Sequence, residues 1–243
     1  MRVAVISDIH GNLHALEAVL EAIETHEPEL VWCLGDLVGY GPRPNRCCTV
    51  VEARADVCLV GNHDLVALGR VGVDDFTPEA AASALWTAEV LEEGPRRFLE
   101  VLSPSADLAG ASLYHASPRE PVWEYVLTPE AAVAAFATSA ARVILVGHTH
   151  VPLAIALSGG GLTGGVAAGG TKISLGEEAR WLLNPGSVGQ PRDGDPRSAY
   201  LLLDLAAGSA AFHRVAYPVE RTQKEMRERG LPEVLAARLE QGL

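Results

Sequence analysis

One pattern recurs along this chain and restricts its fold more than any other. Short apolar runs end in glycine or serine, and polar side chains that can bind metal ions follow at once. The runs span residues 3–6, 30–34, 57–60 and 143–146. Runs of this length, rich in Val, Leu and Ile, are typical of strands buried in a sheet. Helical segments lie between them, and this alternation predicts an α/β fold with a largely parallel portion.

The segments outside these strands predict a second structural pattern. Apolar residues between 13 and 23 recur at helical spacing and form one stripe. The stretches 77–102 and 129–136 are also predicted helices, with prolines at suitable starting positions. From residue 153 onward short strands follow, including a glycine-rich hairpin tip. The charged tail, residues 220–243, is predicted to be helical, either as one segment or as two short helices around residues 230–232.

Length and composition fit a single domain over residues 1–243, or a two-layer domain with an appendage. Apolar residues make up 48%, which is typical of a globular protein. The net charge of −12 argues against non-specific binding to nucleic acid or to an anionic membrane, so nucleic acid enters only as a possible substrate. No run has the length of a membrane span or a signal peptide, and the four cysteines lack C-x-x-C spacing. We therefore expect a cytoplasmic protein with reduced thiols, and the pattern leaves its oligomeric state unknown.

The strand ends carry the candidate functional residues. Ligand sites in α/β sheets form at the carboxyl ends of strands, so these side chains are expected to face one crevice. Hard carboxylate oxygens and imidazole nitrogens suit Mn, Fe, Zn or Ni, and the lack of cysteine in the set argues against a structural zinc site. The candidates are Asp8, His10, Asp36, Asn62, His63, His115, His148 and His150.

Spacing suggests how these residues share metal ions. Residues two apart point the same way in an extended turn, so Asp8 and His10 are expected to chelate one ion, and His148 and His150 likewise. The set is too large for one tetrahedral site, but it suffices for two divalent ions roughly 3.5–4 Å apart. The bridging role suits Asp36, because a carboxylate has two oxygens.

These motifs, in this order, resemble the calcineurin-like metallophosphoesterase superfamily. The motifs are D-x-H at Asp8 and His10, G-D at Asp36, G-N-H-D at 61–64, a single His at His115, and G-H-T-H at 147–150. Each motif alone is common, whereas the ordered set is highly specific. The motif-bearing region spans residues 1–150, and the strands and C-terminal helices of 151–243 look like the family's second sheet. The resemblance implies two packed mixed β-sheets flanked by helices, in a four-layer sandwich.

The resemblance also implies roles for individual residues. His63 would be a catalytic group close to the leaving group, and the activity would be hydrolysis of a phosphodiester, or a phosphomonoester, by a metal-activated hydroxide. The stretches 35–42 and 115–125 are similar to a bacterial branch of small phosphoesterases and phosphodiesterases acting on small phosphorylated substrates. One ion would be held by Asp8, His10, Asp36 and His150, and the other by Asp36, Asn62, His115 and His148.

Two positions depart from the protein phosphatase branch of this family. That branch has an Asp and an Arg shortly after the G-D motif, where this chain has Gly39 and Tyr40. The Asp would orient the catalytic His, and the Arg would bind phosphate bidentately. Their absence argues against a phosphoprotein phosphatase and leaves the residue that orients His63 open, with Asp64 available next to it. The candidates for binding the rest of the substrate are Arg43, Arg119 and Arg192.

Several residues keep two interpretations. The segment 184–187 is slightly favoured as a plain turn, against a lining of the crevice. Trp123 and Tyr125 are core aromatics or a wall for a base or sugar, with neither preferred. The alternative to an enzyme is a non-catalytic scaffold or binding protein on the same fold, which the full ligand set with His63 disfavours. A different metal hydrolase, acting on amide or ester bonds, is disfavoured by the order of the motifs. The histidines interpreted as surface residues are His14, His26 and His213.

Overall fold

The structure is a computed structural model that describes residues 1–108 and 110–243, and its strands form two mixed sheets of six strands each. The first sheet has the order β3 (Val57–Cys58), β2 (Leu30–Cys33), β1 (Arg2–Ile6), β11 (Ser198–Asp204), β12 (Ser209–Val215) and β9 (Lys172–Ser174). The second has the order β4 (Ser105–Leu108), β5 (Ala111–Tyr114), β6 (Val143–Leu145), β10 (Arg180–Asn184), β7 (Leu153–Ser158) and β8 (Gly161–Val166).

The parallel part of each sheet contains the strands that precede the metal-type residues. β1, β2 and β3 are parallel neighbours, with Ile6 opposite Cys33 and Cys33 opposite Cys58. In the second sheet β5 and β6 are parallel, with Leu113 opposite Leu145. Parallel neighbours end at the same edge of a sheet, so five strand ends are available to build one site.

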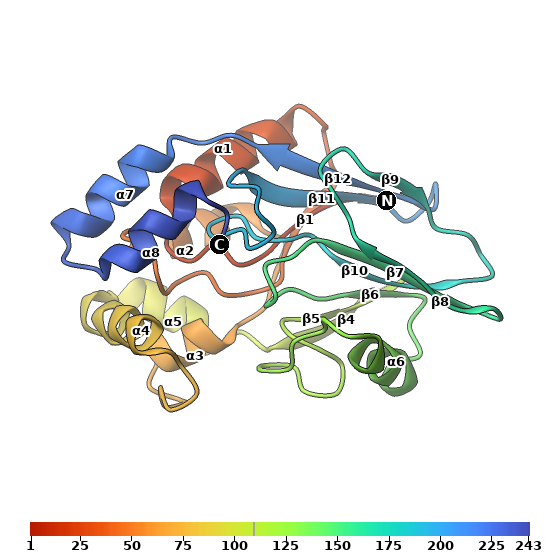
Figure 1. The fold of residues 1–243 in the computed structure, drawn as a ribbon, viewed down its shortest axis with the longest axis horizontal. Helices are drawn as coiled ribbons and strands as arrows, with labels where there is room; N and C mark the ends of the chain where they lie inside the picture. Colours follow the sequence, from red (N-terminus) through yellow and green to blue (C-terminus); the bar gives the residue numbers. More distant parts are fainter. Residues whose placement is uncertain (109) are drawn as a thin grey trace.

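The two sheets pack face to face, and helices cover their outer faces (Figure 1). Val3 and Val5 of β1 lie in the core between the sheets, whereas Ala4 and Ile6 pack toward the outer helices. This alternation is the two-residue period of a strand that is buried on both faces. The predicted fold class, two packed mixed sheets flanked by helices, is confirmed. The flanking helices are α1 (Leu13–Glu24) and α2 (Pro44–Arg54) on the first sheet and α6 (Pro129–Thr138) on the second.

The remaining helices gather at one end of the sandwich (Figure 1). A cluster of apolar side chains joins Tyr40 to α4 and to the C-terminal helices, so the tail of the chain covers the region next to the strand ends. The tail is helical, as predicted, and it contains two short helices. The helices at this end of the sandwich are α3 (Asn62–Ala67), α4 (Pro78–Val90), α5 (Glu93–Glu100), α7 (Val219–Glu228), α8 (Glu233–Ala237) and the 3₁₀ turn η1 (Arg238–Glu240).

The predicted helical stretch 77–102 is interrupted between Val90 and Glu93, where the side chain of Asn45 binds the main chain. Its side-chain amide donates to the carbonyl of Val90, and its Oδ1 accepts from the amide of Glu92. The chain is extended at Leu91, and Pro95 falls in the first turn of α5 rather than at its first residue. Proline has no amide hydrogen and so is tolerated in a first turn.

No helix in the described ranges has the length and apolar content needed to cross a membrane.

Candidate metal centre

The loops after the parallel strands of both sheets meet at one place and are joined by main-chain hydrogen bonds. The amide of Asp8 donates to the carbonyl of Gly35 (3.0 Å), and the amide of His10 donates to the carbonyl of Asp36 (2.9 Å). Across the second sheet the amide of Gly147 donates to the carbonyl of His115 (2.8 Å). All eight metal-type candidates are buried in this region.

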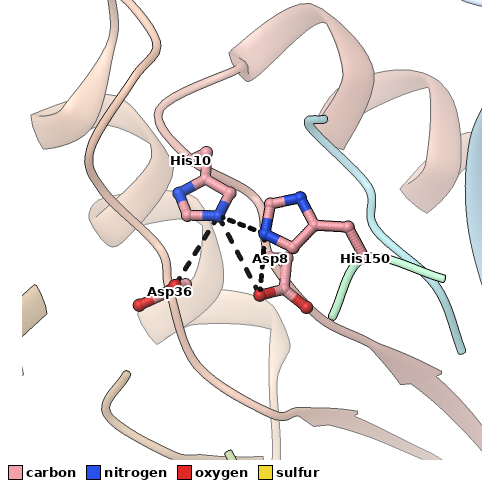
Figure 2. A group of neighbouring side chains, drawn as sticks. All are labelled: Asp8, His10, Asp36 and His150. Atoms are coloured by element: carbon pink, nitrogen blue, oxygen red, sulfur yellow. Dashed lines mark hydrogen bonds and ion pairs between the residues drawn. The ribbon is translucent and has the colours of Figure 1, made fainter. Parts of the chain in front are cut away.

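The ligand atoms form two groups that share Asp36. In the first, one atom from each of Asp8, His10, Asp36 and His150 lies within 4.8 Å of every other, and Figure 2 shows these side chains pointing toward a common space. The second group consists of Asp36, His115 and His148. Asn62 joins it, because its Oδ1 lies 3.2 Å from Nε2 of His115.

The carboxylates of Asp8 and Asp36 each have one oxygen held by the main chain and one directed at the imidazoles. Oδ1 of Asp36 accepts the amide hydrogen of His63 (2.9 Å). Its Oδ2 lies 3.6 Å from Nε2 of His10 and 3.5 Å from Nε2 of His115, and has no hydrogen-bond partner among the described residues. Asp8 repeats the arrangement: Oδ2 accepts from the amide of His148, and Oδ1 faces His10 and His150.

Main-chain carbonyls fix the orientation of all four imidazoles. Nδ1 of His10 donates to the carbonyl of Val38, Nδ1 of His150 to that of Gln190, and Nδ1 of His115 to that of Leu34. A carbonyl can only accept, so the other ring nitrogen keeps its lone pair for a metal ion. Nε2 of His10 and Nε2 of His150 consequently face each other at 3.0 Å. The fourth ring, His148, uses Nε2 toward the carbonyl of Trp123, which leaves Nδ1.

The backbone at the ligand positions is strained. Only seven non-glycine residues in the described ranges have positive φ, and five of them are ligand candidates. The left-handed region costs roughly 1–2 kcal/mol for a residue with a Cβ atom. Strain concentrated in this way is typical of functional sites. The five are Asp8 (55°), His10 (49°), Asp36 (52°), His148 (61°) and His150 (61°).

Burial shifts the protonation of these groups strongly. It raises the pKa of Asp8 to about 7 and that of Asp36 well above its ordinary value. It lowers the pKa of His148 to about 2 and those of His10 and His150 well below the ordinary value. Carboxylate oxygens without partners and imidazole lone pairs that face each other are destabilising unless a cation lies between them. The donor set therefore fits divalent transition metal ions.

The spacing argument for His148 and His150 was wrong. It assigned both to one ion, but His150 belongs with Asp8 and His10, whereas His148 belongs with His115. Residues two apart share a direction only in extended backbone. Both histidines lie in a turn with φ of 61°, where spacing alone does not fix the direction of a side chain; Asp8 and His10, with φ of 55° and 49°, do share one group.

His63 is held by aromatic rings rather than by a carboxylate. Its ring lies 4.3 Å from that of Tyr40 and 4.5 Å from that of Phe76, measured between centroids. Nδ1 of His63 has no hydrogen-bond partner within the described ranges, and a Cβ atom on Gly39 would lie 2.4 Å from it. Burial lowers the pKa of His63 well below its ordinary value, so the ring is neutral near pH 7.

Asp64, the available neighbour, does not orient His63. Its Oδ1 accepts from the amides of Leu37 and Val38, and its Oδ2 accepts from the amide of Gly61. Burial raises the pKa of Asp64 to about 6. The side chain thus ties the G-D loop to the G-N-H-D loop, a role that the sequence interpretation missed.

A pocket of about 320 Å³ opens beside the second ligand group. Asn62, His63 and His148 form one part of its lining. Trp123 and Tyr125 form another, so these aromatics line the crevice, and the Tyr125 ring stacks on that of His148 at 4.2 Å. The lining that sequence reasoning did not find includes Tyr40, Asp75, Phe76 and Arg238.

Of the three predicted substrate arginines, only Arg192 lies in this pocket. Arg43 lines a different cavity and forms an ion pair with Glu225 at 2.7 Å. Arg119 is exposed and paired with Glu124. Both residues follow a motif in the sequence, but neither lines the pocket, because each side chain turns toward a nearby carboxylate.

The remaining ambiguous residues also have defined positions. Asn184 is more than a plain turn residue, since its amide donates to the carbonyl of Gly147 and to Oγ1 of Thr149. His14 is partly buried and lies 3.1 Å from a carboxylate oxygen of Glu225. His26 and His213 lie together at the edge of a separate cavity.

Two mixed sheets with a buried Asp–His cluster at the strand ends define the calcineurin-like class of phosphoesterases. Residues 1–208 match the sequence profile of the calcineurin-like phosphoesterase superfamily domain, and the chain belongs to this family. The predicted family is therefore confirmed. Arg238, which lines the pocket, lies outside the residues that match the family profile.

Two solved structures and one further protein sequence match this chain over almost its whole length. A metallophosphoesterase from Sphaerobacter thermophilus is 40% identical, with a TM-score of 0.89, and the match covers 100% of this chain and 99% of that one. An uncharacterized protein of Methanocaldococcus jannaschii is 37% identical over 242 residues, 98% of this chain and 96% of that protein. A hypothetical protein from Pyrococcus horikoshii shares the fold at 23% identity, with a TM-score of 0.81 over 100% of this chain and 98% of that one.

Proposed function

We propose that this protein is a dinuclear metal-dependent phosphoesterase that hydrolyses small phosphodiesters in preference to phosphoproteins. The observation that carries the proposal is the position of Asp36. Its Oδ2 has no hydrogen-bond partner among the described residues and faces both His10 and His115 at nearly equal distances. A carboxylate oxygen placed between two imidazole groups is what a pair of neighbouring cations requires.

The residues that would hold the two ions follow from the geometry. When bound, such ions lower the pKa of a water molecule so that hydroxide is available near neutral pH, and they neutralise phosphoryl oxygens. The main-chain carbonyls behind the imidazoles keep each ring in the tautomer that binds a cation. The set for one ion is Asp8, His10, Asp36 and His150, and for the other Asp36, Asn62, His115 and His148.

The role proposed for His63 is a hydrogen bond to the leaving oxygen. It lines the pocket next to Asn62, and its neutral ring can donate through N–H. The His63 ring packs between Tyr40 and Phe76, and this packing restricts its orientation. In the protein phosphatase branch an aspartate would have this positioning role. Gly39 permits this packing, because any side chain there would collide with His63.

The preference for small diesters rests on what replaces the phosphatase residues. Tyr40 stands where the phosphatase branch has its phosphate-binding arginine, and its ring contributes to the pocket wall. The pocket has aromatic sides and a volume of about 320 Å³, which suits a small organic group rather than a protein surface.

Metal reconstitution tests the proposal. The purified protein is stripped of metal, and Mn, Ni, Co, Zn and Mg are added back separately. We expect binding of two ions per chain by elemental analysis and faster cleavage of bis-p-nitrophenyl phosphate than of p-nitrophenyl phosphate. Asp36→Asn should abolish the binding of two ions and the cleavage of the esters. Asp107→Asn, which changes an exposed carboxylate, should preserve them. Protein that binds two ions but cleaves neither ester would instead support a non-catalytic binding protein.

A further inference from the structure

Two arginines in the pocket have no carboxylate partner in the described ranges, whereas some arginines elsewhere in the chain have one. Arg214 pairs with Asp193, and Arg43 pairs with Glu225. Neither Arg192 nor Arg238 forms an ion pair within the described ranges, and Nε of each is buried without a partner there. A guanidinium group has five donor hydrogens, so much of the donor capacity of both side chains is unused.

The two guanidinium groups also lie close to each other. Nη2 of Arg192 and Nη2 of Arg238 donate to the same acceptor, Oε1 of Gln190, at 3.0 and 2.5 Å. Both cations lie near the ring of Tyr40, with Cζ at 5.8 Å from the centroid for Arg192 and 4.8 Å for Arg238. Burial, and then the charge of Arg192, lowers the pKa of Arg238. Two partly buried like charges are unfavourable unless an anion neutralises them.

The cations face the same pocket as the proposed metal ligands. The chain has a net charge of −12, so this concentration of positive charge is local rather than general. Asp75, the acidic residue of the lining, is exposed. A diester carries one negative charge at the phosphorus under attack, and the proposed metal ions already neutralise it. The two arginines therefore provide positive charge beyond what that phosphate needs.

We propose that Arg192 and Arg238 bind a second phosphate group of the substrate, and that the preferred substrates are nucleotide-like esters with at least one phosphate beyond the one attacked. Planar guanidinium groups bind phosphate oxygens through paired N–H donors. The rings of Phe76 and Trp123, which meet edge to face at 5.7 Å, supply a surface for a flat base. This inference rests on the proposed phosphoesterase function.

Three esters with the same leaving group test the inference. They are bis-p-nitrophenyl phosphate, the p-nitrophenyl ester of thymidine 5′-phosphate, and the γ-p-nitrophenyl ester of thymidine 5′-triphosphate. In each, water adds its oxygen to the esterified phosphorus, the P–O bond to nitrophenol breaks, and the phenol leaves with one proton. Product chromatography also detects cleavage of the anhydride bonds, and free metal concentration is held constant.

We expect the wild type to have its highest kcat/KM on the triphosphate ester. Arg192→Ala and Arg238→Ala should each lower kcat/KM for that ester by about 10–100-fold, the range for a lost hydrogen bond to a charged group, and lower it by less than about threefold for bis-p-nitrophenyl phosphate. Arg238→Lys should recover part of the loss, because it keeps the charge but not the planar fork. Arg46→Ala removes an exposed arginine outside the pocket and should change neither value.

The outcomes separate this inference from the proposed function. Equal losses on all three esters, or a wild type that prefers bis-p-nitrophenyl phosphate, would overturn the second-phosphate subsite and leave the phosphoesterase intact. No turnover of any ester by protein shown to hold two metal ions would overturn both. Circular dichroism and thermal unfolding of each variant establish that a selective loss does not come from misfolding.

Discussion

The metal centre and the pocket beside it are built in opposite ways. The centre comes from short loops that directly follow parallel strands, and main-chain groups hold almost every ligand in place. The pocket wall comes mostly from residues outside the sequence motifs of these loops, including Phe76, Trp123, Arg192 and Arg238. The first is a local consequence of strand ends, whereas the second depends on how the C-terminal helices pack over α4. The metal-type residues of this protein therefore lie in recognisable local motifs, whereas most residues of the pocket wall do not.

The largest expected effect tests the local part of this comparison. Asp36→Asn removes the oxygen shared by the two ligand groups, and kcat/KM should fall by about 10³-fold or more, since ions of this kind contribute several kcal/mol to transition-state stabilisation. The same variant should raise the stability of the metal-free protein by about 1 kcal/mol, or 2–4 °C in Tm, because a buried carboxylate is gone. Activity assays and metal-free thermal unfolding check the two halves. An active Asp36→Asn enzyme would remove the basis for a bridging carboxylate.

A smaller effect is expected where the two regions meet, at Gly39. A methyl group there would lie 2.4 Å from Nδ1 of His63, and the residue has φ of +85°. Gly39→Ala should displace the His63 ring and lower kcat by about 100-fold, as small misplacements in active sites do, with both metal ions still bound. Gly170→Ala is the matched control, because Gly170 has a similar φ of +88° and a methyl group added there would have no neighbour within 4 Å. Full activity of Gly39→Ala would argue against a role for His63.

The pocket walls should change selectivity more than chemistry. Phe76→Ala should raise KM about 10-fold for the p-nitrophenyl ester of thymidine 5′-phosphate, as expected for one lost base-stacking contact, and change KM for methyl p-nitrophenyl phosphate little. Because His63 loses a packing partner, kcat should fall by the same factor for both esters. Leu127→Ala, an exposed apolar residue outside the pocket, serves as control. Identical changes of KM with both esters would mean that Phe76 acts only by packing against His63.

The smallest effect should come from Arg43, which sequence position had suggested as a substrate residue. The charge of Arg43 and its hydrogen bonds lower the pKa of Glu225, so their contribution to stability is present above the ordinary pKa of Glu and is lost as the pH falls through the lowered value. Arg43→Ala should cost about 1 kcal/mol at pH 7, less in acid, and leave kcat/KM within about twofold. Urea unfolding of wild type and Arg43→Ala, at pH 7 and in acid, measures this difference in the free energy of unfolding. A large activity loss would return Arg43 to the substrate site.

The sequence predicted the fold and the ligand set because both depend on short-range patterns. An apolar run followed by Asp8 and His10 reports a strand end directly. The division of His148 from His150 was not predictable from spacing, because spacing does not fix the direction of side chains in a turn: Asp8 and His10 have similar φ and share one group. Arg238 could not be found, since no motif surrounds it and its contact with Gln190 spans 48 positions. Phe76 likewise reaches His63 only through the folding of a loop.

The left-handed backbone at five ligand positions has an evolutionary consequence. Glycine adopts that conformation at lower cost than aspartate or histidine. A lineage released from selection for catalysis would gain stability each time glycine replaced one of these ligands. A metal-free descendant of this chain would therefore be a more stable protein. The two aspartates and three histidines at these positions therefore place metal-type side chains on backbone that a sequence chosen for stability alone would give to glycine.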